Sequence, residues 1–236
     1  MTAAPPLVSC LMVTRGNLFP ARFAIEAFRR QSWPHRELVI VCDAPAAELR
    51  EHLQTLADPA IRFVAAAEAP LGTLRNLAVA EANGAFCIQW DDDDLHAPQR
   101  VEAQMAVFDR QPVDAVFLHR WAMWWPFERR VAISGRRIWE GTMLARTEAI
   151  LPYPALPRGE DTAMAAAMYE RSRFALLDRP DLYCYVIHGR NAWEAAHFEM
   201  LFANATQRFE QENYEAARAQ LAAKLPLDAY AKALGL

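Results

Sequence analysis

Residues 85–94 of the chain read AFCIQWDDDD, in which a mostly apolar run of six residues passes directly into four consecutive aspartates. A short run of this kind is typical of a strand that is buried on both faces of a sheet. Four adjacent carboxylates repel one another, so their place at the end of a buried strand favours a bound cation. Their oxygen atoms suit Mg²⁺ or Mn²⁺, and a metal held in this way can also bind phosphate oxygens.

The aspartates have a simpler alternative explanation, which is a solvated acidic turn that caps a helix beginning near Pro98. Aspartate is favoured at helix N-termini, and for an isolated acidic cluster this explanation would be the better one. The preceding strand and the polar residues that follow other strands favour the cation site instead. Because side chains alternate along an extended segment, Asp91 and Asp93 should then point to the same side.

Apolar runs alternate with amphipathic segments on both sides of this strand. Strands are expected at residues 7–13, 37–42, 61–64, 85–90 and 113–119. Helices are expected between them, at about 19–31, 46–56 and 72–82, with Gly84 as the stop signal of the third helix. This rhythm predicts an α/β fold with a doubly wound, mostly parallel central sheet flanked by helices.

Polar residues follow three of the expected strands immediately. They are Thr14 and Arg15, then Asp43, then the aspartates that begin at Asp91. In doubly wound sheets, ligands bind beyond the carboxyl ends of the strands. The sequence therefore predicts that these polar groups collect at one edge of the sheet.

The pattern changes after residue 119. Residues 121–125 and 129–133 are expected to form a hairpin or mixed strands, and three prolines make 151–158 a loop. A helix is expected at 161–171, strands at 174–177 and 183–187, and mostly helical structure at 193–225. No internal repeat or linker interrupts the chain, so we expect one domain over residues 1–236.

The composition excludes several classes of protein. Hydrophobic residues make up 53% of the 236, which is enough for a substantial core, so a disordered chain is excluded. The net charge of −4 gives no support for a nucleic-acid partner, which normally needs a basic face. No apolar run reaches the roughly 18–20 residues that cross a bilayer, and no basic region precedes the first apolar stretch. We therefore expect neither a transmembrane segment nor a signal peptide.

The cysteines indicate a reducing compartment. Cys10, Cys42, Cys87 and Cys184 each lie in an apolar run, and none belongs to a C-x-x-C pair of the kind that binds zinc. Free cysteine is among the most often buried residue types, so buried and reduced thiols are expected. This pattern predicts a cytoplasmic protein.

Two charged residues stand near the starts of expected helices. Arg75 lies in the first turn of its helix, where it could meet a diphosphate through a forked, charge-assisted contact; a surface arginine is the simpler alternative. Asp161 follows Arg158-Gly159-Glu160 and could take a proton from an acceptor hydroxyl. An ordinary N-cap is the alternative for Asp161, and the two roles are compatible because a capping carboxylate has a fixed orientation.

One histidine and four tryptophans are further candidates. His188 follows the strand expected at 183–187 and could bind a metal or a phosphate, although an isolated histidine is more often structural. The tryptophans could stack on sugar rings, although core packing is the commoner use of such residues. They are Trp121, Trp124, Trp125 and Trp139.

Several of these segments resemble the family 2 glycosyltransferases, which have the GT-A fold. The most specific match is WDDDDLHAP at 90–98, which is similar to the L-D-x-D-D-x-x-x-P form of the DXD motif. VSCLMVTRGN at 8–17 looks like the first strand and donor-binding turn of the family, and LRNLAVAEANGA at 74–85 looks like its A-R-N-x-G-x-x-x-A-x-G segment. The pair at 160–161 aligns with an E-D pair, and YVIHGRN at 185–191 resembles a Y-R-x-H-x-x-N stretch.

The resemblance implies transfer of one sugar from a nucleoside-diphosphate sugar to an acceptor hydroxyl, with inversion at the anomeric carbon. It implies a divalent metal, Mn²⁺ or Mg²⁺, held by Asp93 with the help of His188, and Asp161 as the catalytic base. Residues from 1 to about 118 would form the half that binds the nucleotide sugar, and those from about 119 to 236 an acceptor-side half of mixed strands and C-terminal helices. The donor would contact Thr14, Arg15, Asp43, Arg75, Asn76, Asp91 and Asp92, with Asp91 at the nucleoside and Asp43 at its base.

The match to the family pattern is incomplete. Cys42-Asp43-Ala44-Pro45 stands where the family has D-D-G-S, so only the second carboxylate is kept. Neither a Q-x-x-R-W motif nor a membrane span is present, so a processive polysaccharide synthase is not expected. The acceptor could be a glycan, a lipid-linked molecule or a small molecule, and peripheral contact with a membrane stays open.

Two other classes of protein remain as alternatives. A non-catalytic binding protein would keep the donor pocket without turnover, but the intact Glu160-Asp161 pair argues against it. A nucleotidyltransferase also combines an α/β sheet with a metal and a nucleotide. Such enzymes usually carry a glycine-rich loop with a lysine near the first strand, whereas TRGNLFP at 14–20 has one glycine and no lysine.

Overall fold

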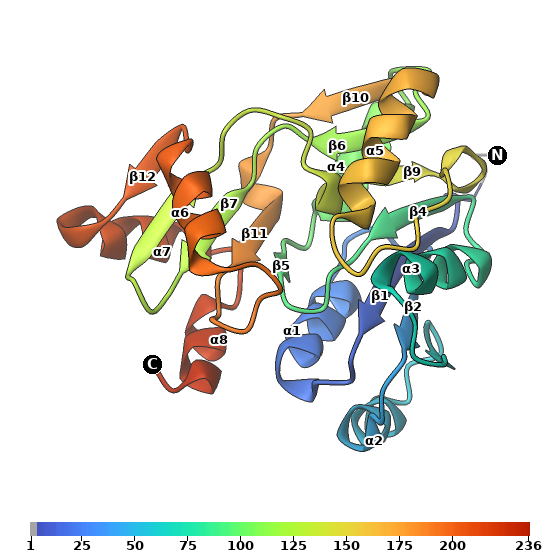
Figure 1. Ribbon diagram of the computed structural model, residues 1–236, viewed down its shortest axis with the longest axis horizontal. Coiled ribbons are helices and arrows are strands. Elements are labelled where there is room, and N and C mark those ends of the chain that lie inside the picture. The colour runs from blue at the N-terminus through green and yellow to red at the C-terminus, as the bar shows by residue number, and fades with distance from the viewer. Residues whose placement is uncertain (1–3) are drawn as a thin grey trace.

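The computed structural model describes residues 4–236 and contains two β-sheets with helices packed against them (Figure 1). The central sheet has seven strands in the order β10-β6-β9-β4-β1-β2-β3. Its strands are β1 (Val8–Thr14), β2 (Arg36–Cys42), β3 (Ile61–Ala65), β4 (Phe86–Gln89), β6 (Ala115–Leu118), β9 (Leu144–Arg146) and β10 (Phe174–Leu177). Neighbouring strands are parallel except where β9 pairs with β4 and β6. The predicted doubly wound, mostly parallel central sheet is confirmed.

Helices cover both faces of the central sheet. They are α1 (Leu18–Arg29), α2 (Ala47–Leu56), α3 (Leu71–Ala80), α4 (Arg100–Phe108) and α5 (Glu160–Arg171). Because side chains alternate along a strand, β1 contributes to two cores. Cys10 and Met12 pack in one core with Ile25 of α1, whereas Leu11 packs in another with Leu74 of α3. Burial on both faces is the reason that these strands are nearly continuous apolar runs.

The second sheet is formed largely by the second half of the chain, in the order β12-β8-β7-β11-β5. Its strands are β5 (Leu95–His96), β7 (Ala122–Trp125), β8 (Arg130–Ile133), β11 (Tyr183–Val186) and β12 (Gln207–Phe209). β7 and β8 form the predicted antiparallel hairpin, and β11 runs parallel to β7. The helices that contribute to its core are α6 (Ala195–Ala203), α7 (Tyr214–Ala222) and α8 (Leu227–Leu234). The mixed strands predicted for the second half of the chain are therefore observed.

The four aspartates connect the two sheets. They follow β4 of the central sheet and lead into β5, which pairs with β11 of the second sheet. Helix α4 begins only at Arg100, and its N-cap residue is Gln99. The alternative explanation of the aspartates as a helix cap is therefore wrong.

Sequence patterns missed the short strands β5, β9 and β12, and the role predicted for Gly84 is wrong. Helix α3 ends at Ala80 with Glu81 as its C-cap residue, ahead of this glycine. A Cβ atom on Gly84 would lie 2.7 Å from Ser9 Oγ and 2.8 Å from the carbonyl oxygen of Leu7. Glycine is required there by a close approach to the start of β1, and not by the end of the helix.

The four cysteines are buried and unpaired, as the sequence predicts. Within residues 4–236, none of the helices combines the length and the apolar character that crossing a bilayer requires.

Candidate active site

A cleft of about 590 Å³ lies at the carboxyl ends of β1, β2 and β4, and residues of the second sheet and of the start of α5 complete its walls. This volume is typical of a pocket for a small ligand. Nine of the ten predicted site residues line it, so the structure brings them together. They are Thr14, Arg15, Asp43, Arg75, Asp91, Asp92, Asp93, Asp161 and His188.

Asn76 is the predicted site residue that does not line the cleft. Its amide nitrogen donates to the carbonyl oxygen of Tyr153, and its amide oxygen accepts from the backbone N–H of Tyr153, both at 2.8 Å. A close approach at Gly72 accompanies this pairing, since a Cβ atom there would lie 1.8 Å from the carbonyl oxygen of Pro154. Asn76 therefore fastens the proline-rich loop to α3, and the geometry gives no support for its implied contact with the donor.

Asp93 and His188 meet in the cleft although they are 95 residues apart in the sequence. Asp93 stands between β4 and β5, and His188 follows β11. His188 Nε2 lies 3.0 Å from Asp93 Oδ2. The side chain of Asn191 orders the turn after β11, because it accepts from the backbone N–H of His188 at 2.9 Å and donates to the carbonyl oxygen of Val186 at 2.8 Å.

Asp94 fastens the aspartate segment to the second sheet. Its carboxylate accepts hydrogen bonds from the hydroxyl of Tyr183 and, at 2.9 Å, from the backbone N–H of Val186. Only 1% of Asp94 is exposed. Burial, together with the neighbouring charges of Asp93 and Asp91, raises the pKa of Asp94 well above its ordinary value. Asp94 is a structural tie between β4 and β11.

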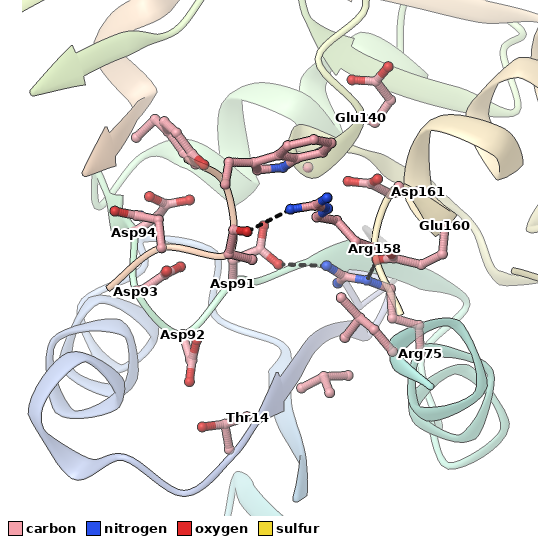
Figure 2. A pocket seen from close by; sticks show the side chains of 18 of the residues that line it. Thr14, Arg75, Asp91, Asp92, Asp93, Asp94, Glu140, Arg158, Glu160 and Asp161 are labelled. Carbon is pink, nitrogen blue, oxygen red and sulfur yellow. Dashed lines mark hydrogen bonds and ion pairs between the residues drawn. The ribbon is translucent and has the colours of Figure 1, made fainter. Parts of the chain in front are cut away.

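Arg75 lies between the aspartate segment and α5 (Figure 2). Its Nη2 donates to Asp91 Oδ1 at 3.0 Å, and its Nε donates to Glu160 Oε1 at 2.6 Å. Burial alone would lower the pKa of Arg75, but Asp91, Asp161 and Glu160 together raise it. With two carboxylates engaging its guanidinium, Arg75 acts as a link between two segments of the site. These contacts use two of the five N–H groups of the guanidinium, so the predicted contact with a diphosphate stays a prediction.

Asp161 lies in the first turn of α5 and faces the cleft (Figure 2). The helix begins at Glu160, and its N-cap residue is Gly159, which has a φ of +76° and provides no side-chain cap. Asp161 Oδ1 accepts a hydrogen bond from the backbone N–H of Thr162 at 2.8 Å. The alternative of an ordinary N-cap for Asp161 is therefore wrong.

The carboxylates at the end of β4 carry more negative charge than Arg75 can balance. Burial raises the pKa of Asp91, even though Arg75 opposes this shift. Burial and the neighbouring Asp93 raise the pKa of Asp92 to about 8, although a hydrogen bond with Thr14 lowers it in part. A bound divalent cation would favour the ionised form of these groups.

The residues around Asp93 fit a divalent cation. Among residues 4–236, no three His, Cys, Asp or Glu side chains converge as a complete protein cage for a metal. Mg²⁺ and similar ions commonly use one or two carboxylates, with water and substrate phosphates as the other ligands. Two ligands at right angles, each about 2.1 Å from a metal, lie about 3 Å apart. Asp93 Oδ2 and His188 Nε2, which form a hydrogen bond of 3.0 Å, are therefore close enough together to be two such ligands.

The aspartate segment rests on a buried arginine that the sequence does not single out. Arg100 is fully buried, its Nη2 donates to the carbonyl oxygen of Gln89 at 3.0 Å, and its Nη1 lies 2.6 Å from His96 Nδ1. The guanidinium also lies over the rings of Trp90 and Tyr183, at 5.3 and 4.8 Å from their centroids. Burial and Arg100 lower the pKa of His96, so His96 stays neutral and can accept this hydrogen bond.

Only two of the four predicted tryptophans line the cleft. Trp121 and Trp139 stack with a centroid distance of 4.2 Å, and Trp121 stacks on Tyr185 at 5.0 Å. Trp124 and Trp125 are buried in the core of the second sheet. Core packing therefore accounts for these two residues, and stacking on a sugar stays a prediction for the other two.

A doubly wound sheet with a polar cleft at its strand ends is the architecture of an α/β enzyme. Residues 10–149 match the family model for Glycosyl transferase family 2, and the chain belongs to this family. It is therefore a glycosyltransferase. No curated protein sequence shows a significant match to the chain.

Solved structures with the GT-A fold resemble this one. Residues 1–349 of S. aureus TarS in complex with UDP have a TM-score of 0.64 and 16% identity, over 82% of this chain and 69% of that chain. The complex of TarS 1–349 with UDP-GlcNAc has a TM-score of 0.62 and 16% identity, over 80% and 60%. The mannosyltransferase PcManGT from Pyrobaculum calidifontis, in complex with GDP-Man and Mn²⁺, has a TM-score of 0.65 and 15% identity, over 84% and 61%. Identities this low show a likeness in fold alone.

Proposed function

We propose that this protein is an inverting glycosyltransferase that moves one sugar from a nucleoside-diphosphate sugar to an acceptor hydroxyl with the help of a divalent metal. The observation that carries the proposal is the 3.0 Å approach of Asp93 to His188 in the cleft that Asp161 also lines. Membership of the family supports sugar transfer. The complexes of the structural neighbours with UDP, UDP-GlcNAc and GDP-Man support a nucleotide-sugar donor.

Asp93 and His188 would hold the metal, Mn²⁺ or Mg²⁺. One carboxylate oxygen and one imidazole nitrogen leave room for phosphate oxygens in the coordination shell. The Mn²⁺ in the complex of PcManGT supports this part of the proposal. When bound, the metal would neutralise the charge that grows on the departing diphosphate.

The nucleoside would bind at the ends of β1 and β2, where Thr14, Arg15 and Asp43 line the cleft. Asp91 and Asp92, at the end of β4, would face the donor from the other side. We further propose one domain with a division of labour, in which residues from 1 to about 118 bind the donor and those from about 119 to 236 bind the acceptor. The four unpaired thiols support work in a reducing compartment such as the cytoplasm.

Asp161 would take the proton from the acceptor hydroxyl. The acceptor oxygen then bonds to the anomeric carbon as the bond from that carbon to the phosphate oxygen breaks, so the configuration inverts. Glu160 is the nearest other carboxylate along the chain, but it is 1% exposed and paired with Arg75. Glu160 is therefore poorly placed to act as the nucleophile of a double displacement, which supports a single displacement.

Thermal unfolding with nucleoside diphosphates, in the presence and absence of Mn²⁺, tests this function. A ligand at 100 times its dissociation constant stabilises the folded state by about 2.7 kcal/mol. We expect one of UDP, GDP, ADP, CDP or dTDP to raise the melting temperature in a Mn²⁺-dependent way. Asp93→Asn should remove the Mn²⁺-dependent part, and the exposed Asp109→Asn should not. If none of these nucleotides gives a Mn²⁺-dependent shift, the donor assignment is wrong.

A further inference from the structure

We propose that the acceptor carries an anionic group, a phosphate or a carboxylate, which binds to Arg158 and Arg190 beside Asp161. This inference rests on the proposed function, because it takes Asp161 as the base that the acceptor hydroxyl must reach. It adds the chemical class of the acceptor, which neither the family nor the fold specifies.

The acceptor side of the cleft has two arginines that no ion pair within residues 4–236 balances. The charged residues there are Arg137, Glu140, Arg158, Glu160, Asp161 and Arg190, of which Glu160 is paired with Arg75. Arg137 is balanced within the protein, since its Nη2 lies 2.7 and 2.8 Å from the two carboxylate oxygens of Glu140. In the part of the chain that the structure describes, Arg158 and Arg190 form no ion pair. An anion bound between them would supply the negative charge that no ion pair among the described residues gives to these two arginines.

Arg158 is held in place, and its guanidinium can still donate hydrogen bonds to a ligand. Its Nη1 donates to the carbonyl oxygen of Ala192 at 2.9 Å, and its guanidinium lies 4.2 Å from the ring centroid of Trp193. A guanidinium has five N–H groups, so several remain available for a ligand. Figure 2 shows Arg158 extending into the cleft on the same side as Asp161. A guanidinium group fixed in this way is suited to binding a carboxylate or a phosphate through two hydrogen bonds.

The residues behind Trp193 reinforce this arrangement. His197 stacks on Trp193 with a centroid distance of 4.5 Å and an interplanar angle of 16°. Burial lowers the pKa of His197, and the charges of Arg137 and Arg158 lower it further. Arg137 and Arg158 are therefore close enough to His197 to affect its protonation.

Position along the chain favours the acceptor over the donor as the partner of Arg158. Arg158 lies three residues before Asp161, on the loop that leads into α5, whereas the donor would lie against β1, β2 and β4. Asp161 would repel an anionic acceptor, so such a molecule needs nearby cations in order to bring its hydroxyl to Asp161. Arg190 is closer to the donor side, because it follows His188 by two residues. A role of either arginine with the donor diphosphate is therefore an outcome that the experiment must distinguish.

Sulfate is the probe, since it carries two negative charges and a guanidinium binds it as it binds phosphate. Isothermal titration of sulfate into the protein saturated with nucleoside diphosphate and Mn²⁺ should show binding. Arg158→Gln and Arg190→Gln should each weaken this binding by about tenfold, the loss expected from one charge-assisted contact. Arg208→Gln, at an exposed position of β12, is the matched control and should leave sulfate binding unchanged.

Acceptor pairs that differ only in charge identify the kind of anion. We expect glucose 6-phosphate to be a better acceptor than glucose if the group is a phosphate, and galacturonate a better one than galactose if it is a carboxylate. Sulfate binding that is absent, or that is equal in wild-type protein and Arg158→Gln, overturns the proposal. A loss of nucleotide affinity in Arg158→Gln and Arg190→Gln also overturns it, because these arginines would then serve the donor. Failure of the proposed function appears separately, as absence of Mn²⁺-dependent nucleotide binding.

Discussion

Arg75 and Glu160 form an ion pair of 2.6 Å in which only 2% of the Glu160 side chain is exposed. The same guanidinium reaches Asp91 at 3.0 Å, so one cation joins the segment after β4 to the first turn of α5. A buried ion pair seldom adds much net stability, but its rupture leaves an unpaired charge away from water. The ion pair thus connects the donor side of the cleft to the helix turn that carries Asp161, which follows Glu160 directly.

Removal of the Glu160 charge should therefore reduce both stability and turnover. We expect Glu160→Gln to lower the free energy of unfolding by about 1–3 kcal/mol, because Arg75 loses one of its two carboxylate partners. Urea denaturation measures this change. The ion pair of Arg129 with Glu215 at 2.7 Å, whose side chains are 65% and 60% exposed, provides the control. Glu215→Gln should cost less than about 1 kcal/mol, and equal losses in the two variants would contradict the role of the buried pair.

Asp161→Asn should separate binding from catalysis. The amide cannot accept the proton of the acceptor hydroxyl, so we expect turnover to fall by about 10²–10⁴-fold. Mn²⁺-dependent nucleotide binding should be unchanged, because Asp161 is not among the residues that would bind the donor. Turnover is measured as sugar transfer, or as hydrolysis of the donor when water replaces the acceptor. Glu170→Gln, at an exposed position of the same helix, should keep full activity. Full activity of Asp161→Asn would rule out the mechanism.

The parts of the fold that could be predicted from the sequence are those with a local signal. β1 and β4 are buried on both faces and are therefore apolar runs, and the prolines mark the loop before α5. β9 has only three residues, and it is a strand because β4 and β6 pair with it from either side. A stretch of three residues carries no local signal of the strands with which it pairs elsewhere in the chain.

The residues of the candidate site also divide into those that the sequence indicates and those that it does not. The aspartates and Asp161 could be singled out because their residue types and the family resemblance coincide. The place of Arg75 depends on Glu160, which lies 85 residues further along the chain, so a surface arginine and a buried link are indistinguishable in the sequence. Arg100 is buried by Trp90 and Tyr183, and the latter belongs to a strand of the other half.

The raised pKa of Asp92 should make the metal-free protein less stable as the pH rises. Its pKa is about 8 in the folded protein, compared with about 4 for an unfolded chain. Between these pH values the folded protein holds a proton that the unfolded chain has lost, so the free energy of unfolding falls as the pH increases. Asp92→Asn removes this contribution, so its stability should fall less between pH 5 and pH 8.

Urea denaturation across this pH range, with a chelator present, measures the effect, and Asp109→Asn is the control because its side chain is exposed. Added Mn²⁺ should reverse the decline in the wild-type protein, since a cation favours the ionised carboxylate. Asp91, Asp94 and Glu160 also have raised pKa values, so some decline should remain in Asp92→Asn. Identical pH dependence in the wild-type protein and Asp92→Asn would contradict the assignment.

Tyr183→Phe should show whether the tie between β4 and β11 also controls the metal site. The substitution keeps the ring and removes only the hydroxyl that donates to Asp94, so Asp94 keeps its hydrogen bond from Val186. We expect a loss of about 1–2 kcal/mol in the free energy of unfolding. Because Asp94 is adjacent to Asp93 and β11 leads to His188, Mn²⁺-dependent nucleotide binding should also weaken, by roughly tenfold or more.

The exposed Tyr169 provides the control for this substitution, since 62% of it is accessible. Tyr169→Phe should change stability by less than about 0.5 kcal/mol and leave nucleotide binding intact. If Tyr183→Phe is destabilised but binds nucleotide and Mn²⁺ as the wild-type protein does, Asp94 is only a structural tie. If Tyr183→Phe binds nucleotide more weakly but still requires Mn²⁺ to do so, the approach of Asp93 to His188 depends on this hydrogen bond.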